Sequence, residues 1–484
     1  MLKLTNSDRK FFSLVTEATF SNPFGPYREQ IDRQITGLDS SRRRMEIMEQ
    51  EIRLIDEKLR ELEKKGCRQI DDFDPVDREL MKYVYLFAIY HQYATAFDDL
   101  IIRQVQAGPK PIKVPFADRA MADLAGCGFK ADQIPRCFAM FYQIRRAFHR
   151  IDRMLIGPSP CMRQLRMNLW NNIFTHDIRR YEQYLWDKME DFSTLLEGPT
   201  GCGKGAAAAA IGQSGFIPFD LEKKCFALPF TQTLIEVNLA QFTPSLIESE
   251  LFGHARGAFT GAVADYDGVF ARCRRHDTIF LDEISEIRPN VQVKLLRVLQ
   301  ERTFWPVGSH DRRIFEGRVI GATNQPAADL RRTGRFRDDF YYRLCADCIR
   351  VPSLRQRIEE CPEELPSLTG HFLKQIIGEP DSYLVGQVLD VIDGTLGPNY
   401  PWPGNVRELA QCIRRVILKQ DYEKDPLSSD KLPASPDAVE ELTAQEVLRR
   451  HCTALYERCG NYGTVARITG LDRRTVKKYI TAVS

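Results

Sequence analysis

Residues Phe192-Ser-Thr-Leu-Leu-Glu-Gly-Pro-Thr-Gly-Cys-Gly-Lys204 pass from an apolar run into a glycine-rich loop, and alanines dominate residues 205–212 that follow. This order predicts a buried strand, a tight loop and a helix. Glycines let backbone N–H groups curl around phosphate oxygens, the helix N-terminus adds positive dipole, and Lys204 can reach the β- and γ-phosphates. A glycine-rich turn without a ligand is the alternative that this segment alone leaves open.

The predicted phosphate-binding loop departs from the general pattern at one position. Its residues are Gly198, Pro199, Thr200, Gly201, Cys202, Gly203, Lys204 and Gly205. Gly205 stands where a Ser or Thr hydroxyl normally binds Mg²⁺ in such loops. Metal binding must therefore depend on other groups of the chain.

Two carboxylates further along the sequence fit that role. The apolar run Asp277-Thr-Ile-Phe-Leu-Asp-Glu283 predicts a buried strand that ends in an acidic pair. Asp282 fits Mg²⁺ and its waters, and Glu283 fits the residue that polarises an attacking water, because phosphoryl transfer needs charge neutralisation and a positioned nucleophile. An acidic pair that only solubilises a strand end is the alternative, and the order after a phosphate-binding loop favours the functional interpretation.

The length of the chain predicts several domains. With 484 residues it exceeds what one hydrophobic core usually supports, so about three domains are expected. The expected divisions are helical residues 1–155, α/β residues 156–360, helical residues 361–424, a proline-containing linker 425–440 and a small unit 441–484.

Composition and charge exclude several classes of protein. Hydrophobic residues make up 43% and charged residues 28% of the chain, so global disorder is excluded. The net charge of +2 gives no chain-wide case for nucleic acid or an anionic membrane. No apolar stretch is long enough to span a membrane and no secretory segment is present, so a cytoplasmic location is expected. The 13 irregularly spaced cysteines favour reduced thiols.

A heptad pattern marks one predicted helix of the N-terminal region. Its apolar positions are Leu38, Met45, Met48, Ile52, Ile55, Leu59 and Leu62, and Gly66 ends the pattern. Because the repeat covers only about three heptads, an antiparallel hairpin inside a bundle and an intermolecular coiled coil are equally expected. A further helix is predicted from Asp77 to about Gln106.

The last 44 residues have the spacing of a helix-turn-helix. The small Ala466 lets two helices approach, Gly470 makes the turn and Val476 packs back on the core. Residues 441–484 contain eight basic and four acidic side chains, a local charge of +4. The side chains expected to face DNA are Arg473, Arg474, Thr475, Lys477 and Lys478. A solvated charged helix is the alternative, and the turn spacing favours DNA binding.

Between the two nucleotide motifs lies a segment that resembles a known family. The hexapeptide Gly257-Ala-Phe-Thr-Gly-Ala262 resembles the loop signature of the sigma-54-dependent transcriptional activators, a branch of the AAA+ ATPases. In that family the loop projects from a ring and engages the sigma factor, and the resemblance assigns the contact to Phe259 and Thr260. The loop residues are Gly257, Ala258, Phe259, Thr260, Gly261 and Ala262. Glycines at both ends and an apolar tip suit a presented loop, whereas a turn with Phe259 packed inward is the alternative.

Two motifs that resemble phosphate sensors follow the family's order. Asn238 resembles the asparagine that couples the γ-phosphate state to the catalytic glutamate. Thr323 and Asn324, in Gly321-Ala-Thr-Asn324, resemble the first sensor. The resemblance therefore adds these three side chains to the predicted nucleotide site.

Three arginines match family positions that lie outside the main motifs. Arg337 and Arg343 match the arginine fingers, which reach into the neighbouring subunit, and a guanidinium offered in trans would stabilise transition-state charge. Arg407, in Trp402-Pro-Gly-Asn-Val-Arg-Glu-Leu409, matches the second sensor in the helical lid. Surface ion pairs are the alternative for the first two arginines.

The resemblance covers about residues 156–420 as the ATPase and 442–484 as a Fis-type DNA-binding unit. It implies an α/β AAA+ P-loop ATPase, with a parallel sheet flanked by helices and a helical lid, between an all-α regulatory domain and an all-α helix-turn-helix domain. The implied cofactors are ATP and Mg²⁺. The implied partners are the sigma-54 RNA polymerase holoenzyme, double-stranded enhancer DNA and further copies of the chain, from a dimer to a hexameric ring, with no membrane.

Two departures from the family pattern leave other functions open. The family usually carries an acidic residue where Gly205 stands, which puts metal affinity and hydrolysis in question, and residues 170–190 are expected to contain an inserted helix. A DNA-binding repressor that uses nucleotide only as an assembly switch is therefore the competing interpretation. A AAA+ remodeller unrelated to transcription is a third, against which the hexapeptide and the helix-turn-helix both speak. We expect residues 1–155 to control assembly and restrain the ATPase.

Overall fold

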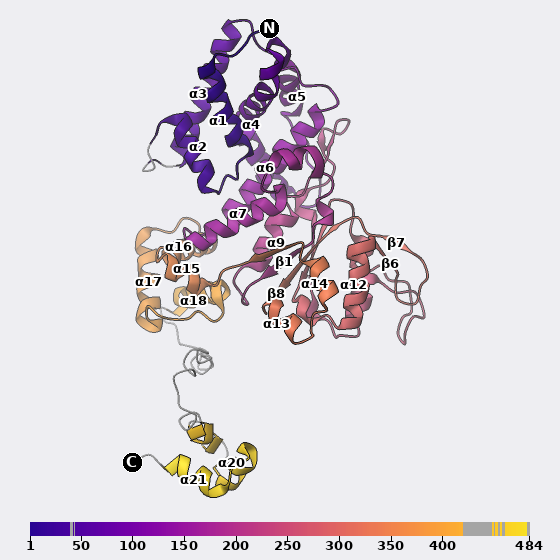
Figure 1. The fold of residues 1–484 in the computed structure, drawn as a ribbon, viewed down its shortest axis with the longest axis vertical. Coiled ribbons are helices and arrows are strands. Elements are labelled where there is room, and N and C mark those ends of the chain that lie inside the picture. The colour runs from indigo at the N-terminus through magenta and orange to yellow at the C-terminus, as the bar shows by residue number, and fades with distance from the viewer. Residues whose placement is uncertain are drawn as a thin grey trace. The chain divides into compact units, whose positions relative to one another are not determined.

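The chain forms two compact units, Met1–Tyr422 and Glu423–Ser484 (Figure 1). The computed structural model describes residues 1–38, 42, 44–419, 448–449, 451–453, 455–456 and 460–481. The expected linker at 425–440 lies outside the described residues. In the part of the chain that is described, no helix is both long and apolar enough to cross a bilayer.

The N-terminal region is a bundle of helices (Figure 1). Its main helices are α1 (Asn6–Phe20), α2 (Pro26–Thr36), α3 (Arg44–Lys64), α4 (Pro75–Ala107), α5 (Ala117–Gly126) and α6 (Ile134–Met154). Helix α4 begins where the side chain of Asp74 accepts a hydrogen bond from the N–H of Val76, and it ends at Gly108. The helix predicted from Asp77 to about Gln106 is thus confirmed.

Helix α3 uses its heptad pattern inside the bundle. Ile55 and Leu62 are buried in the shared apolar core, and α3 packs against α2 and α4. At the other end of the helix, the side chain of Met45 is 74% exposed. The second half of α3 therefore packs within the bundle, which is one of the two arrangements expected for the heptad segment, the other being an intermolecular coiled coil.

A five-stranded parallel sheet forms the centre of the next region. Its strands are β1 (Thr194–Glu197), β4 (Leu234–Asn238), β5 (Thr278–Asp282), β8 (Arg318–Thr323) and β9 (Asp347–Arg350). Their order in the sheet is β4-β5-β8-β1-β9, and every neighbouring pair is parallel. Strands β1 and β8 are buried along their whole length, as expected for a sheet covered on both faces. The predicted α/β fold with a parallel sheet is confirmed.

Helices and short strands complete this region. The helices are α7 (Pro160–Phe174), α8 (Ile178–Arg180), α9 (Lys204–Gly212), α10 (Ile247–Phe252), α11 (Val269–Arg272), α12 (Pro289–Glu301), α13 (Ala327–Arg332) and α14 (Asp338–Leu344). The two-residue strands are β2 (Phe219–Asp220), β3 (Cys225–Phe226), β6 (Thr303–Phe304) and β7 (Arg313–Ile314). Trp170 lies inside α7, which begins at Pro160, and a π-helical turn at Tyr181–Leu185 follows α8. No helix begins at Trp170, so the insertion expected at 170–190 consists of the end of α7 and short turns after it.

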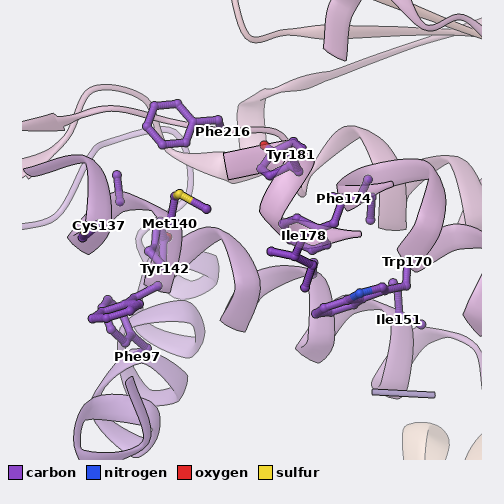
Figure 2. Packing of buried hydrophobic residues seen from close by; sticks show 14 of the residues in the cluster. Phe97, Cys137, Met140, Tyr142, Ile151, Trp170, Phe174, Ile178, Tyr181 and Phe216 are labelled. Atoms are coloured by element: carbon purple, nitrogen blue, oxygen red, sulfur yellow. The ribbon is translucent and has the colours of Figure 1, made fainter. Parts of the chain in front are cut away.

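The N-terminal bundle and the sheet region share one apolar core. Helix α6 packs on α9, and Phe216 belongs to the same apolar cluster as side chains of α6 and α7, near Cys137 and Met140 of α6 (Figure 2). Arg146 of α6 is fully buried and donates hydrogen bonds to the carbonyl oxygens of Gln213 (3.2 Å) and Gly215 (2.6 Å), just past the end of α9. These carbonyls have no intrahelical partner, so Arg146 caps α9 from the neighbouring bundle.

The helical lid follows the sheet and has a core of its own. Its helices are α15 (Leu354–Glu360), α16 (Glu364–Ile377), α17 (Ser382–Leu396) and α18 (Asn405–Lys419). The fully buried Glu364 accepts a hydrogen bond from the N–H of Ser159 (3.0 Å) and pairs with Arg357 (2.8 Å). Through Glu364, the segment that joins α6 to α7 contacts the lid.

A buried arginine ties the sheet to helix α7. Arg318 of β8 donates hydrogen bonds to the side chains of Asn172 (2.7 Å) and Thr194 (3.2 Å) and to the carbonyl of Phe192 (2.9 Å). Asn172 in turn donates to the carboxylate of Asp347 (2.6 Å). Burial lowers the pKa of Arg318 to about 10, and the charge of Asp347 opposes that shift. The network therefore holds three strands and α7 in register.

Replacing this arginine should destabilise the chain strongly. Arg318→Met leaves Asn172 and the Phe192 carbonyl without their donor and Asp347 without a cation, so we expect a loss of about 3 kcal/mol in unfolding free energy. Guanidinium denaturation followed by circular dichroism measures it. The matched control is Arg350→Met, because the Arg350 side chain is 87% exposed beside Glu197 and such pairs contribute little. Equal midpoints for the two variants would contradict the role of the network.

Candidate nucleotide-binding site

Three loops meet at the carboxyl ends of the parallel strands. The glycine-rich loop follows β1, Glu283 follows β5 and Asn324 follows β8. Strand β1 lies between β8 and β9, so the strands that follow β1 in the sequence lie on both sides of it in the sheet, and the strand order reverses next to this loop. Ligands of open α/β sheets bind outside the carboxyl ends of strands at such a switch point. The fold therefore brings the predicted loop residues and the acidic pair to one site.

The glycine-rich loop has the backbone shape that its sequence predicts. Gly201 and Gly203 have φ angles of +77° and +112°, in the region that favours glycine. Lys204 begins α9 and is buried, and its ammonium group donates hydrogen bonds to the carbonyls of Gly198 (2.8 Å) and Pro199 (3.3 Å). The loop thus surrounds a buried cation at a helix N-terminus, which is an arrangement suited to phosphate.

Gly205 has both the space and the backbone conformation for a side chain, whereas Gly203 has the space but a left-handed φ. It lies in the first turn of α9, and a Cβ added there would meet nothing within 4 Å. A Ser or Thr would fit, so the missing hydroxyl is a property of this sequence and is not imposed by crowding.

The acidic pair stands beside the first-sensor loop. Glu283 has a φ of +54°, and the amide of Asn324 donates to its carboxylate at 3.4 Å. Burial, and then the charge of Asp282, raise the pKa of Glu283. A divalent cation held by Asp282 would offset this repulsion, and carboxylate oxygens are the ligands that Mg²⁺ prefers. The residues present therefore fit the predicted metal.

Asn238 lies next to the acidic pair without contacting its glutamate. It ends β4 and is the register partner of Asp282. Its side-chain oxygen accepts a hydrogen bond from the N–H of Ala240 (3.0 Å), and among the described interactions it makes none with Glu283. The predicted switch residue therefore lies at the site, and its side chain caps the short helical turn that follows it.

The lid contacts the glycine-rich loop through the second-sensor motif. The N–H of Arg407 donates to the carbonyl of Gly201 (3.3 Å), and the Asn405 amide donates to the carbonyl of Thr200 (3.0 Å). Asn405 also accepts from the N–H of Leu354 (2.9 Å) and has a φ of +54°. Sequence reasoning assigned a role only to Arg407. The sequence signal that could have identified Asn405 is its place in the Pro-Gly-Asn turn, because asparagine is one of the few residues that tolerate a left-handed backbone in a turn.

The two predicted arginine fingers lie on α14. Arg337 stands exposed at the start of this helix and pairs with Asp339 at 2.8 Å. Arg343 is half-buried and donates to the carbonyl of Leu299 at 2.8 Å. Among the described contacts neither side chain touches the glycine-rich loop of its own chain, so the structure does not bring them into this site.

The hexapeptide forms a closed turn with its aromatic tip at the surface. The N–H of Gly257 donates to the carbonyl of Ala262 (2.8 Å), and the side chain of Phe259 is 40% exposed. Its ring lies 4.9 Å from that of His254, which is hydrogen-bonded to Ser249 of α10 (2.7 Å). Phe259 therefore lies at the surface, and its ring makes an edge contact with the ring of His254. This position agrees with a presented loop.

The C-terminal unit contains the predicted helix-turn-helix elements. Helices α20 (Tyr462–Thr469) and α21 (Arg473–Thr481) flank Gly470, which has a φ of +68°. The carboxylate of Asp472 accepts from the N–H of Arg474 (2.8 Å) and begins α21. Val465 and Val476 are fully buried, and the half-buried Ala466 packs against the same small core.

The basic residues of α21 face outward within this unit. Arg473, Arg474, Lys477 and Lys478 are exposed, and Thr475 is half-buried. The hydrophobic seam of α21, which includes Val476, holds the helix on the unit's core. The geometry agrees with a helix that presents cations on one face.

The sheet order, the glycine-rich loop, the acidic pair and a helical lid that contacts the loop define a P-loop ATPase domain of the AAA+ class. Residues 175–350 match the sigma-54 interaction domain family, and residues 359–447 match the AAA+ ATPase lid domain family. The chain belongs to the family of sigma-54-dependent transcriptional activators.

Several curated relatives are similar over the greater part of the chain. The transcriptional regulatory protein ZraR of Klebsiella oxytoca is 33% identical over 333 residues, 66% of this chain and 67% of its own. The Nif-specific regulatory protein of Azotobacter vinelandii is 34% identical over 347 residues, 68% of this chain and 59% of its own. The chain spans 62% of the length of ZraR from Escherichia coli K12, with 35% identity. Among solved structures, NtrX from Brucella abortus in complex with ATP covers 76% of this chain and 81% of its own at 23% identity, with a TM-score of 0.41.

Alanine substitution should lower the nucleotide affinity at one glycine of the loop and leave it unchanged at another. At Gly201 the φ is positive and a Cβ would lie 2.3 Å from the carbonyl oxygen of Gly404 in the lid, so Gly201→Ala must displace the lid or the loop. We expect its affinity for a fluorescent ADP analogue to fall by about tenfold or more.

Gly205→Ala is the matched control, because its added Cβ meets open space in a helical turn. Its affinity should stay within about twofold and its stability should rise slightly, since alanine favours helices. Equal affinity losses in both variants would contradict the proposed contact between loop and lid.

Proposed function

We propose that this chain is an activator that couples ATP hydrolysis to remodelling of the sigma-54 RNA polymerase closed complex. The observation that carries the proposal is the exposed Phe259 loop, which lies in the same domain as the glycine-rich loop and the acidic pair. A presented apolar tip buries on a partner when contact is made. We further propose a cytoplasmic bacterial protein, because its partner is RNA polymerase.

The nucleotide chemistry follows from the residues at the strand ends. Loop N–H groups and Lys204 would hold the β- and γ-phosphates, and Arg407 would approach the nucleotide from the lid. Asp282 would hold Mg²⁺, which neutralises phosphate charge when bound. Glu283 would accept the proton of the attacking water, and the amide of Asn324 lies 3.4 Å from its carboxylate.

Assembly supplies groups that a single chain lacks. Arg337 and Arg343 lie on α14, away from the glycine-rich loop of their own chain, and we propose that they stabilise the transition state in a neighbouring subunit of a hexameric ring. Asn238, Thr323 and Asn324 would sense the γ-phosphate and pass its state to Glu283. Hydrolysis would then depend on ring formation.

The C-terminal unit supports enhancer binding. Its exposed α21 cations suit base edges and phosphates of double-stranded DNA, and a dimer would match a palindromic site. Bound enhancer DNA would concentrate chains and favour the ring.

Removing the general base should separate binding from hydrolysis. Glu283→Gln keeps the size of the side chain and the hydrogen bond from Asn324 but cannot accept a proton, so we expect ATP affinity within about threefold and turnover reduced by about 100-fold or more. Phosphate release by the assembled chain measures turnover. Hydrolysis at the wild-type rate would remove Glu283 from the mechanism.

Changing the loop tip should separate hydrolysis from activation. Thr260 is exposed and outside the nucleotide site, so Thr260→Ala should hydrolyse ATP at a rate within about twofold of wild type but lose open-complex formation with the sigma-54 holoenzyme. Thr243→Ala, an exposed threonine outside the hexapeptide, is the control and should activate normally. Normal open complexes with Thr260→Ala would contradict the assignment of the loop.

Gly205 favours one other function, a DNA-binding repressor that uses nucleotide as an assembly switch. The missing hydroxyl weakens the metal site, and weak hydrolysis suits a switch. ATPase activity that rises steeply with protein concentration supports the activator, whereas tight ATP binding without turnover supports the repressor.

A further inference from the structure

The N-terminal bundle contains an apolar pocket that the nucleotide mechanism does not use. Its volume is about 150 Å³, and residues of α1 to α4 and α6 to α8 line it. Figure 2 labels Cys137, Met140, Trp170 and Ile178 among the lining residues. Seven of the lining residues are Phe, Tyr or Trp, and aromatic walls favour a flat occupant through offset and edge contacts. An apolar cavity of about this volume can hold one benzene-sized ring.

Most charged side chains around the pocket already have a partner of opposite charge. Four arginines and lysines and four carboxylates form three groups: Arg28 with Asp32 and Glu51, Arg145 with Asp98, and Glu182 with Arg136 and Lys82. Because each member of these groups has a counter-charge within the protein, none of them requires one from a ligand.

Arg44 is the exception among the charged residues that line the pocket. It is exposed at the rim, and among the described residues its guanidinium forms no ion pair. The guanidinium lies over the ring of Phe148, another lining residue, at 5.2 Å from the ring centroid. It donates one hydrogen bond, to the carbonyl of Pro23 (2.5 Å). A guanidinium carries five N–H donors, so Arg44 can still bind a further acceptor at its edge.

The electrostatics of the pocket favour a negative occupant. Burial, and then the charges of Arg28 and Arg145, lower the pKa of the lining residue His91 to about 3. The potential at His91 is therefore positive even though both arginines are paired. Burial also lowers the pKa of Arg44, and the charge of Asp152 opposes that shift without an ion pair between the two side chains. An anion beside Arg44 would supply the missing counter-charge.

The chemistry of Arg44 selects a carboxylate among anions. The planar guanidinium fork matches the two oxygens of a carboxylate. One guanidinium neutralises one negative charge, whereas a dianion would keep an unmatched charge beside apolar walls, which is unfavourable. Arg44 and Pro23 also line a second, more polar pocket next to the first. A carboxylate bound to Arg44 would therefore lie at the polar edge of the apolar pocket.

We propose that this pocket is an effector site for a small aromatic monocarboxylate. The apolar walls hold its ring, and the guanidinium of Arg44 binds its carboxylate at the rim. The site lies in the part of the chain for which the sequence indicated no ligand.

Two helices connect the pocket with the ATPase. Helix α6 lines the pocket through residues that include Ile144. From the same helix, Gln143 donates to the carbonyl of Ser214 (3.0 Å) and Arg146 to that of Gly215 (2.6 Å), just past the end of α9. Helix α7 also lines the pocket and packs on α9. An occupant therefore contacts both helices that hold the phosphate-loop helix, and occupancy changes the hydrolysis rate. This coupling rests on the proposed ATPase function.

Phenylacetate, phenylacetamide and acetate test the binding, because the second compound lacks the charge of the first and the third lacks its ring. Titration calorimetry on the full chain should show saturable 1:1 binding of phenylacetate. Phenylacetamide should bind about tenfold more weakly, because it forms no charge-assisted hydrogen bonds with Arg44. Acetate should also bind about tenfold more weakly, because it buries no ring. Equal affinity for phenylacetate and either of the other two compounds, or no saturation by phenylacetate, would overturn the proposal.

Two neighbouring arginines locate the carboxylate. Arg44→Gln removes the charge at the rim, so the preference for phenylacetate over phenylacetamide should fall from about tenfold to about one. Arg42→Gln is the matched control, because Arg42 lies outside the pocket, is 62% exposed and pairs with Glu46 (3.5 Å). This variant should keep the preference. A preference that survives in Arg44→Gln would overturn the placement of the carboxylate.

A variant of the wall locates the ring. Ile144→Trp adds volume to the pocket and should weaken phenylacetate binding by about tenfold or more, with an unchanged far-ultraviolet circular dichroism spectrum as the check of folding. Met48→Trp fills the pocket from α3 and provides the same test should Ile144→Trp not fold. Unchanged phenylacetate binding in a folded variant of either kind would overturn the location.

The coupling has its own readout. Phenylacetate at saturation should change the ATPase rate of the wild-type chain by at least about twofold, and the same concentration should leave the rate of Arg44→Gln unaffected. Binding without any change in an active ATPase would overturn the coupling. A chain that binds phenylacetate but hydrolyses no ATP under any condition would contradict the proposed function and leave the pocket assignment supported.

Discussion

The structure depends on the burial of α9 from all sides. This helix begins at Lys204, contacts β1, β5 and β8 on one face, and packs against α6 and α7 on the other. Ala207, Ala208 and Ala210 are completely buried, and only small side chains allow a helix to approach a sheet and two helices at once. The alanine run is thus required by packing as much as by helix propensity. Because the phosphate loop is the first turn of this helix, its position is set by the bundle as well as by the sheet.

The features that sequence reasoning predicted correctly are local. The glycine-rich loop, the buried strand that ends at Asp282 and the turn at Gly470 each depend on a few consecutive residues whose backbone has few alternatives. A parallel sheet then brings their strand ends together without further information. The family signature in residues 257–262 is likewise contiguous, and the surface position of Phe259 agrees with it.

The features that the sequence did not reveal depend on distant contacts. From the sequence alone, Arg146 would be expected to lie on the solvated face of an amphipathic helix. In the structure it is fully buried and caps α9 through Gln213 and Gly215. Val465 and Ala466 are neighbours with similar apolar character, and only the helix crossing shows which of them is the more deeply buried. The bundle also contains a pocket lined by residues of seven helices, α1 to α4 and α6 to α8, which no periodic pattern in the sequence encodes. Asn405 stands in a quoted motif, but its role depends on two partners from other elements, Thr200 and Leu354.

The shared core also limits how far the N-terminal bundle can separate from the ATPase domain. A regulatory domain on a flexible linker acts by docking and release, with its own core intact in both states. Here α6 and α7 supply one wall of the ATPase core, so a chain that began after α6 would expose the buried face of α9 to water. Regulation by complete release would therefore cost much of the stability of the nucleotide site. A shift of α6 and α7 along α9 costs far less, because packed helices slide by small amounts while they keep their contacts. Glu364 of the lid accepts a hydrogen bond from Ser159 at the junction of these two helices, so a shift of α6 and α7 along α9 would also displace a contact of the lid.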